Sequence, residues 1–137
     1  KNLNINVTLQ NQEWKVYLDR QREMDYQISR AGWTGDYPDP NTFLDMWTSW
    51  SQQNQTGWAD PKYDALIRKA AITKDPNARL EVFQEAEEIL MDQLPIIPIY
   101  IYTRVYALHP AVKNWHANVL DHHPWKHIDL DLSLLKK

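Results

Sequence analysis

The residues best suited to chemistry lie in one stretch, RAGWTGDYPDP, which runs from Arg30 to Pro40. Asp36 supplies a carboxylate, which can hold a ligand ammonium group through charge-assisted hydrogen bonds. Trp33 supplies a broad apolar wall, and Gly32 leaves the backbone open to close approach because it has no side chain. Together they predict a peptide site, with the ligand main chain paired along Ser29 to Trp33 and its amino end held by Asp36.

A plainer interpretation of the same stretch stays open. Gly32 and Gly35 can make a turn, with Gly35 at positive φ, and Asp36 can cap that turn without binding a ligand. In favour of a site, we expect Asp36 just past the end of a strand, where α/β folds place ligand groups.

Three segments are expected to position this stretch. Asn2 to Leu9 alternates apolar and polar residues with period two, which is typical of a half-buried strand. The segment that follows places Trp14, Tyr17 and Leu18 on one helical face. Tyr26 to Trp33 is predicted to be a second strand. Strand, helix and strand in this order predict a βαβ unit with parallel pairing, and therefore an α/β fold.

Three Asp-Pro pairs each precede a helical pattern, namely Asp39-Pro40, Asp60-Pro61 and Asp75-Pro76. Aspartate caps the free N–H groups of a helix, and proline at the first position lacks only an N–H that would be unpaired anyway. The third predicted helix has an inward stripe of Leu80, Phe83, Ala86, Leu90 and Leu94. Pro95 ends it.

Most aromatic residues of the chain carry a polar group on the ring: there are seven Trp and seven Tyr but two Phe. Trp and Tyr suit binding surfaces, although Tyr17, Trp47 and Tyr63 are expected in the core. Residues 96–108 favour a strand, in which Pro98 indicates an edge or a crossover. The tail from His109 is expected to be irregular.

Composition excludes several function classes. The chain has 137 residues, enough for one ordinary domain. Its net charge is -3 and it has no cluster of basic residues, which argues against a nucleic-acid partner because phosphate binding needs clustered positive charge. The absence of cysteine excludes disulfides and thiolate metal sites. The sequence has no recognisable signal peptide or membrane span, and it begins without Met in a strand pattern. We therefore expect a segment of a longer protein.

Five motifs carry a resemblance over nearly the whole chain: NVTLQNQEWKVYLDRQ, ISRAGWTGDYPDPNTFLDMW, YDALIRKA, ARLEVFQEAEEILMDQLPIIPIYIY and the tail. In this order and spacing they resemble the C-terminal part of bacterial oligopeptide-binding proteins. These are family 5 solute-binding proteins with the type 2 periplasmic-binding fold, and they serve as extracytoplasmic receptors of ABC peptide importers.

The resemblance implies a fold and a setting. It implies a partial lobe with a mixed sheet flanked by helices, in which residues 1–94 form the later part of the second lobe. Residues 95–137 would form a crossing strand and a tail that return to the first lobe. The implied partners are a peptide, the membrane subunits of the permease and the missing N-terminal lobe. The implied location is the periplasm or, for a lipoprotein, the cell surface, with no cofactor and no catalysis.

The resemblance also assigns substrate-binding roles. Asp36 falls on the acid that holds the peptide ammonium group, and Arg30 on an arginine that can meet the carboxylate end of a short peptide. Trp14 and Trp33 match tryptophans of side-chain pockets, and Tyr102 matches a cleft tyrosine. The full implied set is Trp14, Ser29, Arg30, Gly32, Trp33, Asp36 and Tyr102. A second arginine, used for longer peptides, is replaced here by Gln21, which leaves the preferred peptide length open.

Other functions remain as alternatives. Related receptors bind dipeptides, nickel complexes or sugars, and the fragment alone could act only as a dimerising module, with a possible homodimer. A metal site would have to use His116, His122, His123 and His127, whose spacing matches no standard pattern. An enzyme would have to use carboxylate pairs that also occur on solvated helix faces and at caps, namely Asp36 with Asp39, or Asp19 with Glu23.

Overall fold

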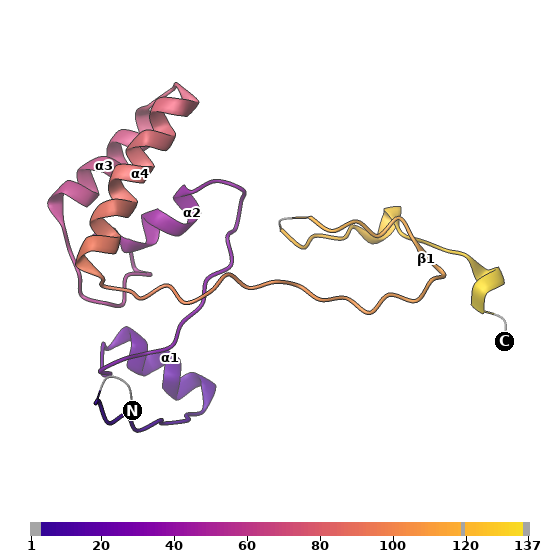
Figure 1. Cartoon of the computed structure of the whole chain (residues 1–137), viewed down its shortest axis with the longest axis horizontal. Coiled ribbons are helices and arrows are strands. Elements are labelled where there is room, and N and C mark those ends of the chain that lie inside the picture. Colours follow the sequence, from indigo (N-terminus) through magenta and orange to yellow (C-terminus); the bar gives the residue numbers. More distant parts are fainter. Residues whose placement is uncertain (1–3, 119, 136–137) are drawn as a thin grey trace.

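The computed structural model describes residues 4–118 and 120–135, and its four α-helices all precede Pro95 (Figure 1). In chain order the elements are α1 (Trp14–Arg22), α2 (Asn41–Leu44), the 3₁₀ helix η1 (Asp45–Trp47), α3 (Pro61–Ile72), α4 (Pro76–Gln93), β1 (Val112–Lys113), the 3₁₀ helix η2 (Trp125–His127), β2 (Asp129–Leu130) and the 3₁₀ helix η3 (Leu132–Leu135).

The two longest helices begin where the Asp-Pro pairs predict. The Asp60 side chain accepts hydrogen bonds from the N–H groups of Lys62 and Tyr63, and α3 starts at Pro61. The Asp75 side chain caps α4 by accepting from the N–H of Ala78. These contacts satisfy helix N–H groups that have no intrahelical partner. Both predicted caps are confirmed.

The hydrophobic core lies where α3 and α4 pack together and α2 closes one end (Figure 1). Its buried members are Leu44, Tyr63, Ile67, Ala70, Val82, Phe83, Ala86 and Leu90. The Tyr63 hydroxyl donates to the Leu44 carbonyl at 2.5 Å, and burial raises the pKa of Tyr63. This bond fixes α2 on α3, because an unpaired carbonyl in the core would be costly.

Part of the predicted helix stripe is wrong. Leu80 and Leu94 are 52% and 55% exposed, and Val82 is buried instead. Leu94 follows the last helical residue and has a left-handed backbone, with φ of 47°, so it no longer shares the inward face of α4. Of the aromatic residues expected in the core, Tyr63 is buried and Trp47 packs partly against it, whereas Tyr17 lies outside.

The predicted βαβ unit is also wrong. No strand occurs in residues 4–9, 26–33 or 96–108, and no backbone–backbone hydrogen bond joins these described segments. Their apolar side chains stay exposed, including Leu9 at 91% and Ile28 at 85%. Alternation gives a segment the pattern of a strand, but a strand forms only when its N–H and C=O groups find a neighbouring strand. Within the described chain these segments have none.

Beyond α4 the chain leaves the helices and runs as one long segment to the tail (Figure 1). There β1 and β2 pair antiparallel, with Val112 opposite Leu130. This two-stranded sheet is the only one in residues 4–118 and 120–135, so the expected mixed sheet is not formed by this chain alone. None of the described helices is both long enough and apolar enough to span a membrane.

Candidate functional site

Asp36 lies on an exposed turn that packs against α2. Its N–H donates to the hydroxyl of Thr42 at 3.1 Å, and Thr42 is buried. A Cβ added to Gly35 would lie 2.9 Å from Cζ of Phe43 and 3.0 Å from Cγ2 of Thr42. Gly35 is therefore needed for close packing, and the prediction of a positive φ at Gly35 is wrong; the positive-φ glycine is Gly57.

The carboxylate of Asp36 makes no ion pair with any cation in the described part of the chain. A second acid, Asp45, lies close enough for the charge of Asp36 to affect its pKa. Burial raises the pKa of Asp45, and the charge of Asp36 raises it further, while a hydrogen bond of 2.9 Å from the Asn41 amide opposes both effects. The turn is thus a region of uncompensated negative charge, which suits a cationic ligand group.

Asp39, three residues later, is in the opposite state. Its two carboxylate oxygens accept from the Nη1 and Nη2 atoms of Arg79 at 2.6 and 2.9 Å. The Asn41 N–H adds a third bond of 2.9 Å, so Asp39 also serves the start of α2. The Arg79 guanidinium is the main cause that lowers the pKa of Asp39. The Asp36–Asp39 pair considered for catalysis therefore has one member already neutralised.

Tyr102 joins two of the predicted site residues. Its hydroxyl accepts from Nη2 of Arg30 at 2.7 Å, and a Cβ on Gly32 would lie 3.1 Å from Cε2 of its ring. The bare face of Gly32 is thus covered by an aromatic ring, whereas the sequence had left it open for a ligand. Figure 1 shows the link between α1 and α2 crossing the segment that follows α4 in this view, and the Arg30–Tyr102 hydrogen bond joins the two segments.

Aromatic residues of α1 lie beside the stretch that carries Arg30. The rings of Trp14 and Tyr17 stack at 5.2 Å, and the Tyr17 hydroxyl donates to the Arg30 carbonyl at 2.8 Å. Gln21 is buried and donates to the Ser29 hydroxyl at 2.9 Å. Five predicted residues are therefore tied to α1 or to Tyr102: Trp14, Ser29, Arg30, Gly32 and Tyr102.

Trp33 and Asp36 stand apart from this group. Trp33 is half-buried, and its indole N–H is buried without a hydrogen-bond partner among the described residues. Sequence reasoning missed Tyr100, whose ring packs edge-on against Tyr102 with centroids 5.0 Å apart. Its spacing of two from Tyr102 was an available signal. It also missed Thr42 and Arg79; no local pattern links Arg79 to Asp39, 40 positions earlier.

The histidine-rich tail forms a small aromatic cluster. The His123 ring stacks on Trp115 at 3.7 Å, and its Nε2 lies 2.8 Å from Oδ1 of Asp121. Tyr106 donates to Asp121, and Arg104 pairs with the same carboxylate at 3.2 Å. His123 is therefore packed against Trp115 and paired with Asp121. No group of three potential metal ligands occurs within the described residues.

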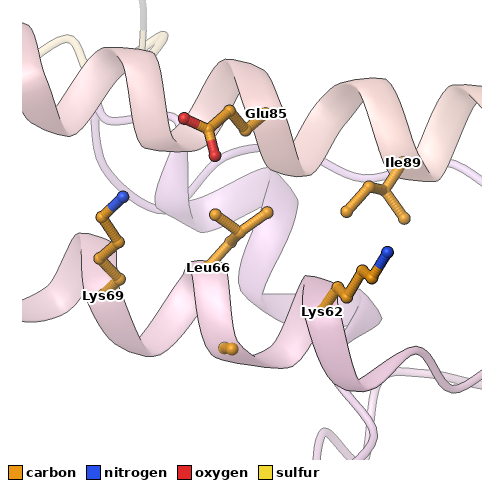
Figure 2. Close-up of a pocket in the computed structure, with 6 residues that line it drawn as sticks. Lys62, Leu66, Lys69, Glu85 and Ile89 are labelled. Atoms are coloured by element: carbon orange, nitrogen blue, oxygen red, sulfur yellow. The ribbon is translucent and has the colours of Figure 1, made fainter.

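A shallow groove between α3 and α4 is separate from all of these residues (Figure 2). Leu66 and Ile89 lie along it, and Lys62, Lys69 and Glu85 extend beside them. Its volume is about 360 Å³. No predicted site residue lines it. The predicted site residues lie instead in two places, on the turn of Asp36 and around the Arg30–Tyr102 hydrogen bond.

Comparison with known proteins agrees with the resemblance predicted from the sequence. Residues 1–55 match the family model described as "Bacterial extracellular solute-binding proteins, family 5 Middle". Residues 1–55 therefore belong to family 5 of the solute-binding proteins. The chain is also 41% identical over 108 residues to the oligopeptide-binding protein OppA of Bacillus subtilis, covering 78% of this chain and 20% of that protein. It is 41% identical over 118 residues to the periplasmic murein peptide-binding protein MppA of Escherichia coli, covering 86% and 22%.

Solved structures give the same fold. The murein tripeptide binding protein MppA of Escherichia coli matches with a TM-score of 0.81 and 34% identity, covering 94% of this chain and 26% of that one. Haemophilus influenzae OppA in complex with RPPGFSPFR matches with a TM-score of 0.81 and 33% identity, covering 91% and 25%. The predicted resemblance and periplasmic-binding fold class are confirmed. The chain spans about a fifth to a quarter of the length of these relatives.

Proposed function

We propose that this chain is a segment of a peptide-binding receptor of an ABC importer and that Asp36 holds the amino end of the peptide. The observation that carries the proposal is the contrast between two neighbouring acids. Asp39 is neutralised by Arg79, whereas Asp36 is exposed and has no cationic partner in the part of the chain that the structure describes. A ligand ammonium group would complete the site through charge-assisted hydrogen bonds.

The ligand main chain is proposed to pair along residues 29–33. The backbone of this stretch makes no backbone–backbone hydrogen bond to other described residues. Apart from the Arg30 carbonyl, which accepts from the Tyr17 hydroxyl, its N–H and C=O groups can therefore serve a ligand. Trp14, Trp33 and Tyr102 supply the aromatic wall, and Arg30 supplies a cation for the carboxylate end of a short peptide. Backbone bonds and end charges do not depend on the side chains of the ligand, so such a site accepts varied peptides.

We extend the proposal to the longer receptor, because this chain matches only 20% to 25% of the length of these relatives. Residues 1–94 would belong to the second lobe, and residues 95–137 would cross to the first lobe. Peptide binding would shift an open–closed equilibrium, and the closed form would dock on the permease, in the periplasm or at the cell surface. The receptor would bind its ligand without chemical reaction.

The test is Asp36→Asn in the full-length receptor, with tetraalanine as the probe in isothermal titration calorimetry. Loss of one charged hydrogen bond should weaken binding by about 1.5–3 kcal/mol. Asp92→Asn, at an exposed site near the end of α4, is the matched control and should leave the affinity unchanged. Equal affinity of the Asp36→Asn variant and the wild type would rule out the Asp36 assignment.

A further inference from the structure

The turn that carries Asp36 is connected to α4 by an unbroken series of contacts. Arg79 grips Asp39 with both terminal nitrogens, and an oxygen of Asp39 accepts from the N–H of Asn41, the first residue of α2. Thr42, the next residue, accepts the hydrogen bond of the Asp36 N–H. A two-pronged arginine–carboxylate contact fixes orientation as well as distance, which a single lysine contact does not.

Arg79 is itself held on three sides. Its guanidinium carbon lies 4.5 Å from the centroid of the Phe83 ring, and its Nε donates to the Ala70 carbonyl at 3.2 Å. The third side is Asp39, and both charged side chains are under a third exposed, at 28% for Arg79 and 30% for Asp39. The position of the Asp39 carboxylate is therefore set by the guanidinium that the α3–α4 core holds in place.

We infer that Arg79 is a positioning residue for the Asp36 carboxylate, acting through Asp39, the start of α2 and Thr42. The inference rests on the proposed role of Asp36 as the partner of a ligand ammonium group. It assigns to α4, which lines no part of the candidate site, control over how strongly the site prefers a free amino end. Arg79 touches no ligand in this role.

Charge and positioning predict opposite results for Arg79→Met, which makes the inference testable. Removing a cation near Asp36 would by its charge alone strengthen the attraction for a ligand ammonium group. Loss of positioning would weaken it, because the turn would no longer hold Asp36 in one place. The readout is the ratio of affinities for tetraalanine and N-acetyl-tetraalanine in the full-length receptor, measured by calorimetry.

We expect the wild type to prefer the free amine by about 10- to 100-fold, the factor for one charged hydrogen bond. Arg79→Met should lower this ratio by about tenfold, which corresponds to 1.4 kcal/mol. The control Arg68→Met removes a cation that lies 4.1 Å over the ring of Trp50, away from the turn, and should leave the ratio unchanged. The charge-neutral double variant Asp39→Asn/Arg79→Met should lower the ratio as well.

A second pair of variants tests the same path without touching an ion pair. Thr42→Val removes the acceptor for the Asp36 N–H with little change in volume, and Thr42→Ser keeps it. Thr42→Val should lower the ratio and Thr42→Ser should preserve it, and this pair decides the matter if Arg79→Met does not fold. A ratio that stays at the wild-type value in folded Arg79→Met or in Thr42→Val, even with a lower melting temperature, would overturn the inference and leave the proposed function standing. A wild type without preference for the free amine would overturn both.

Discussion

The helical region from Asn41 to Gln93 and the segment from Ile96 to Leu108 differ in how they satisfy their backbones. A helix pairs its own N–H and C=O groups, so α3 and α4 form from local signals and then bury Phe83 and its neighbours. The later segment has an equally strong apolar pattern, yet Ile101 and Val105 are 91% and 93% exposed. A β-type segment depends on a neighbour that this chain does not supply within its described residues.

The comparison can be tested first by removing a core side chain from the helical region. Phe83→Ala should lower the free energy of unfolding by about 3–5 kcal/mol, because it leaves a cavity between α3 and α4. Leu80→Ala, on the same helix but 52% exposed, should cost much less. Urea unfolding of the chain, followed by helical circular dichroism, measures both. Similar losses for the two variants would contradict the assigned core.

The second test concerns the exposed segment. We predict that the isolated chain forms a dimer, because Ile101 and Val105 together leave apolar surface worth about 3–6 kcal/mol when fully buried. Light scattering at high concentration should show the dimer in the wild type and a monomer in Ile101→Thr/Val105→Thr. A wild-type chain that stays monomeric at all concentrations would contradict the predicted homodimer. The circular dichroism of α4 should be the same in both proteins.

The smallest expected effect is a change of local structure in the tail, which is held together by charged contacts of Asp121 and not by a buried apolar core. The pKa of Asp121 is lowered first by the Tyr106 hydroxyl and then by His123, with a smaller contribution from Arg104. A lowered folded pKa means that Asp121 contributes stability above the ordinary aspartate pKa and loses it as the pH falls through the folded value. The indole N–H signal of Trp115 in NMR spectra should therefore shift on acidification, before the helices unfold.

Asp121→Asn is the control for that step, since it removes this carboxylate and should abolish the part of the Trp115 shift that occurs as the pH falls below the ordinary aspartate pKa. Side-chain signals from Phe83 and Leu90, which are buried in α4, should not change over the same pH range, because these side chains are apolar and do not titrate. If α4 and Trp115 respond together, the tail and the helical region unfold as one unit, and the contrast between them is incorrect.

Predictions from the sequence succeed where the interacting residues are close together in the chain and fail where they are far apart. Asp60-Pro61 and Asp75-Pro76 predict helix starts correctly because capping involves residues only a few positions apart. The strand at 26–33 fails because its partner lies far away in sequence or outside the described residues. The structure brings Arg30, Gly32 and Tyr102 together, and the covering of Gly32 by Tyr102 was not foreseen.

The two-bond ion pair between Arg79 and Asp39 could not be predicted from the sequence. It spans 40 positions, and both residues already have plausible local roles, one at a helix cap and one on a solvated helix face. Only the packing of α2 against α4 brings them together. The same holds for Thr42, whose hydroxyl reaches Asp36 because Gly35 lets the turn approach α2.

Gln21 constrains how this protein can change over evolutionary time. It occupies the position where the resemblance implies an arginine for longer peptides, but here it is buried and bonded to Ser29. Gln21→Arg would bury a charge beside a hydroxyl that cannot neutralise it, at a cost in stability. A stable arginine at this position would therefore need a second substitution that supplies a partner for its charge.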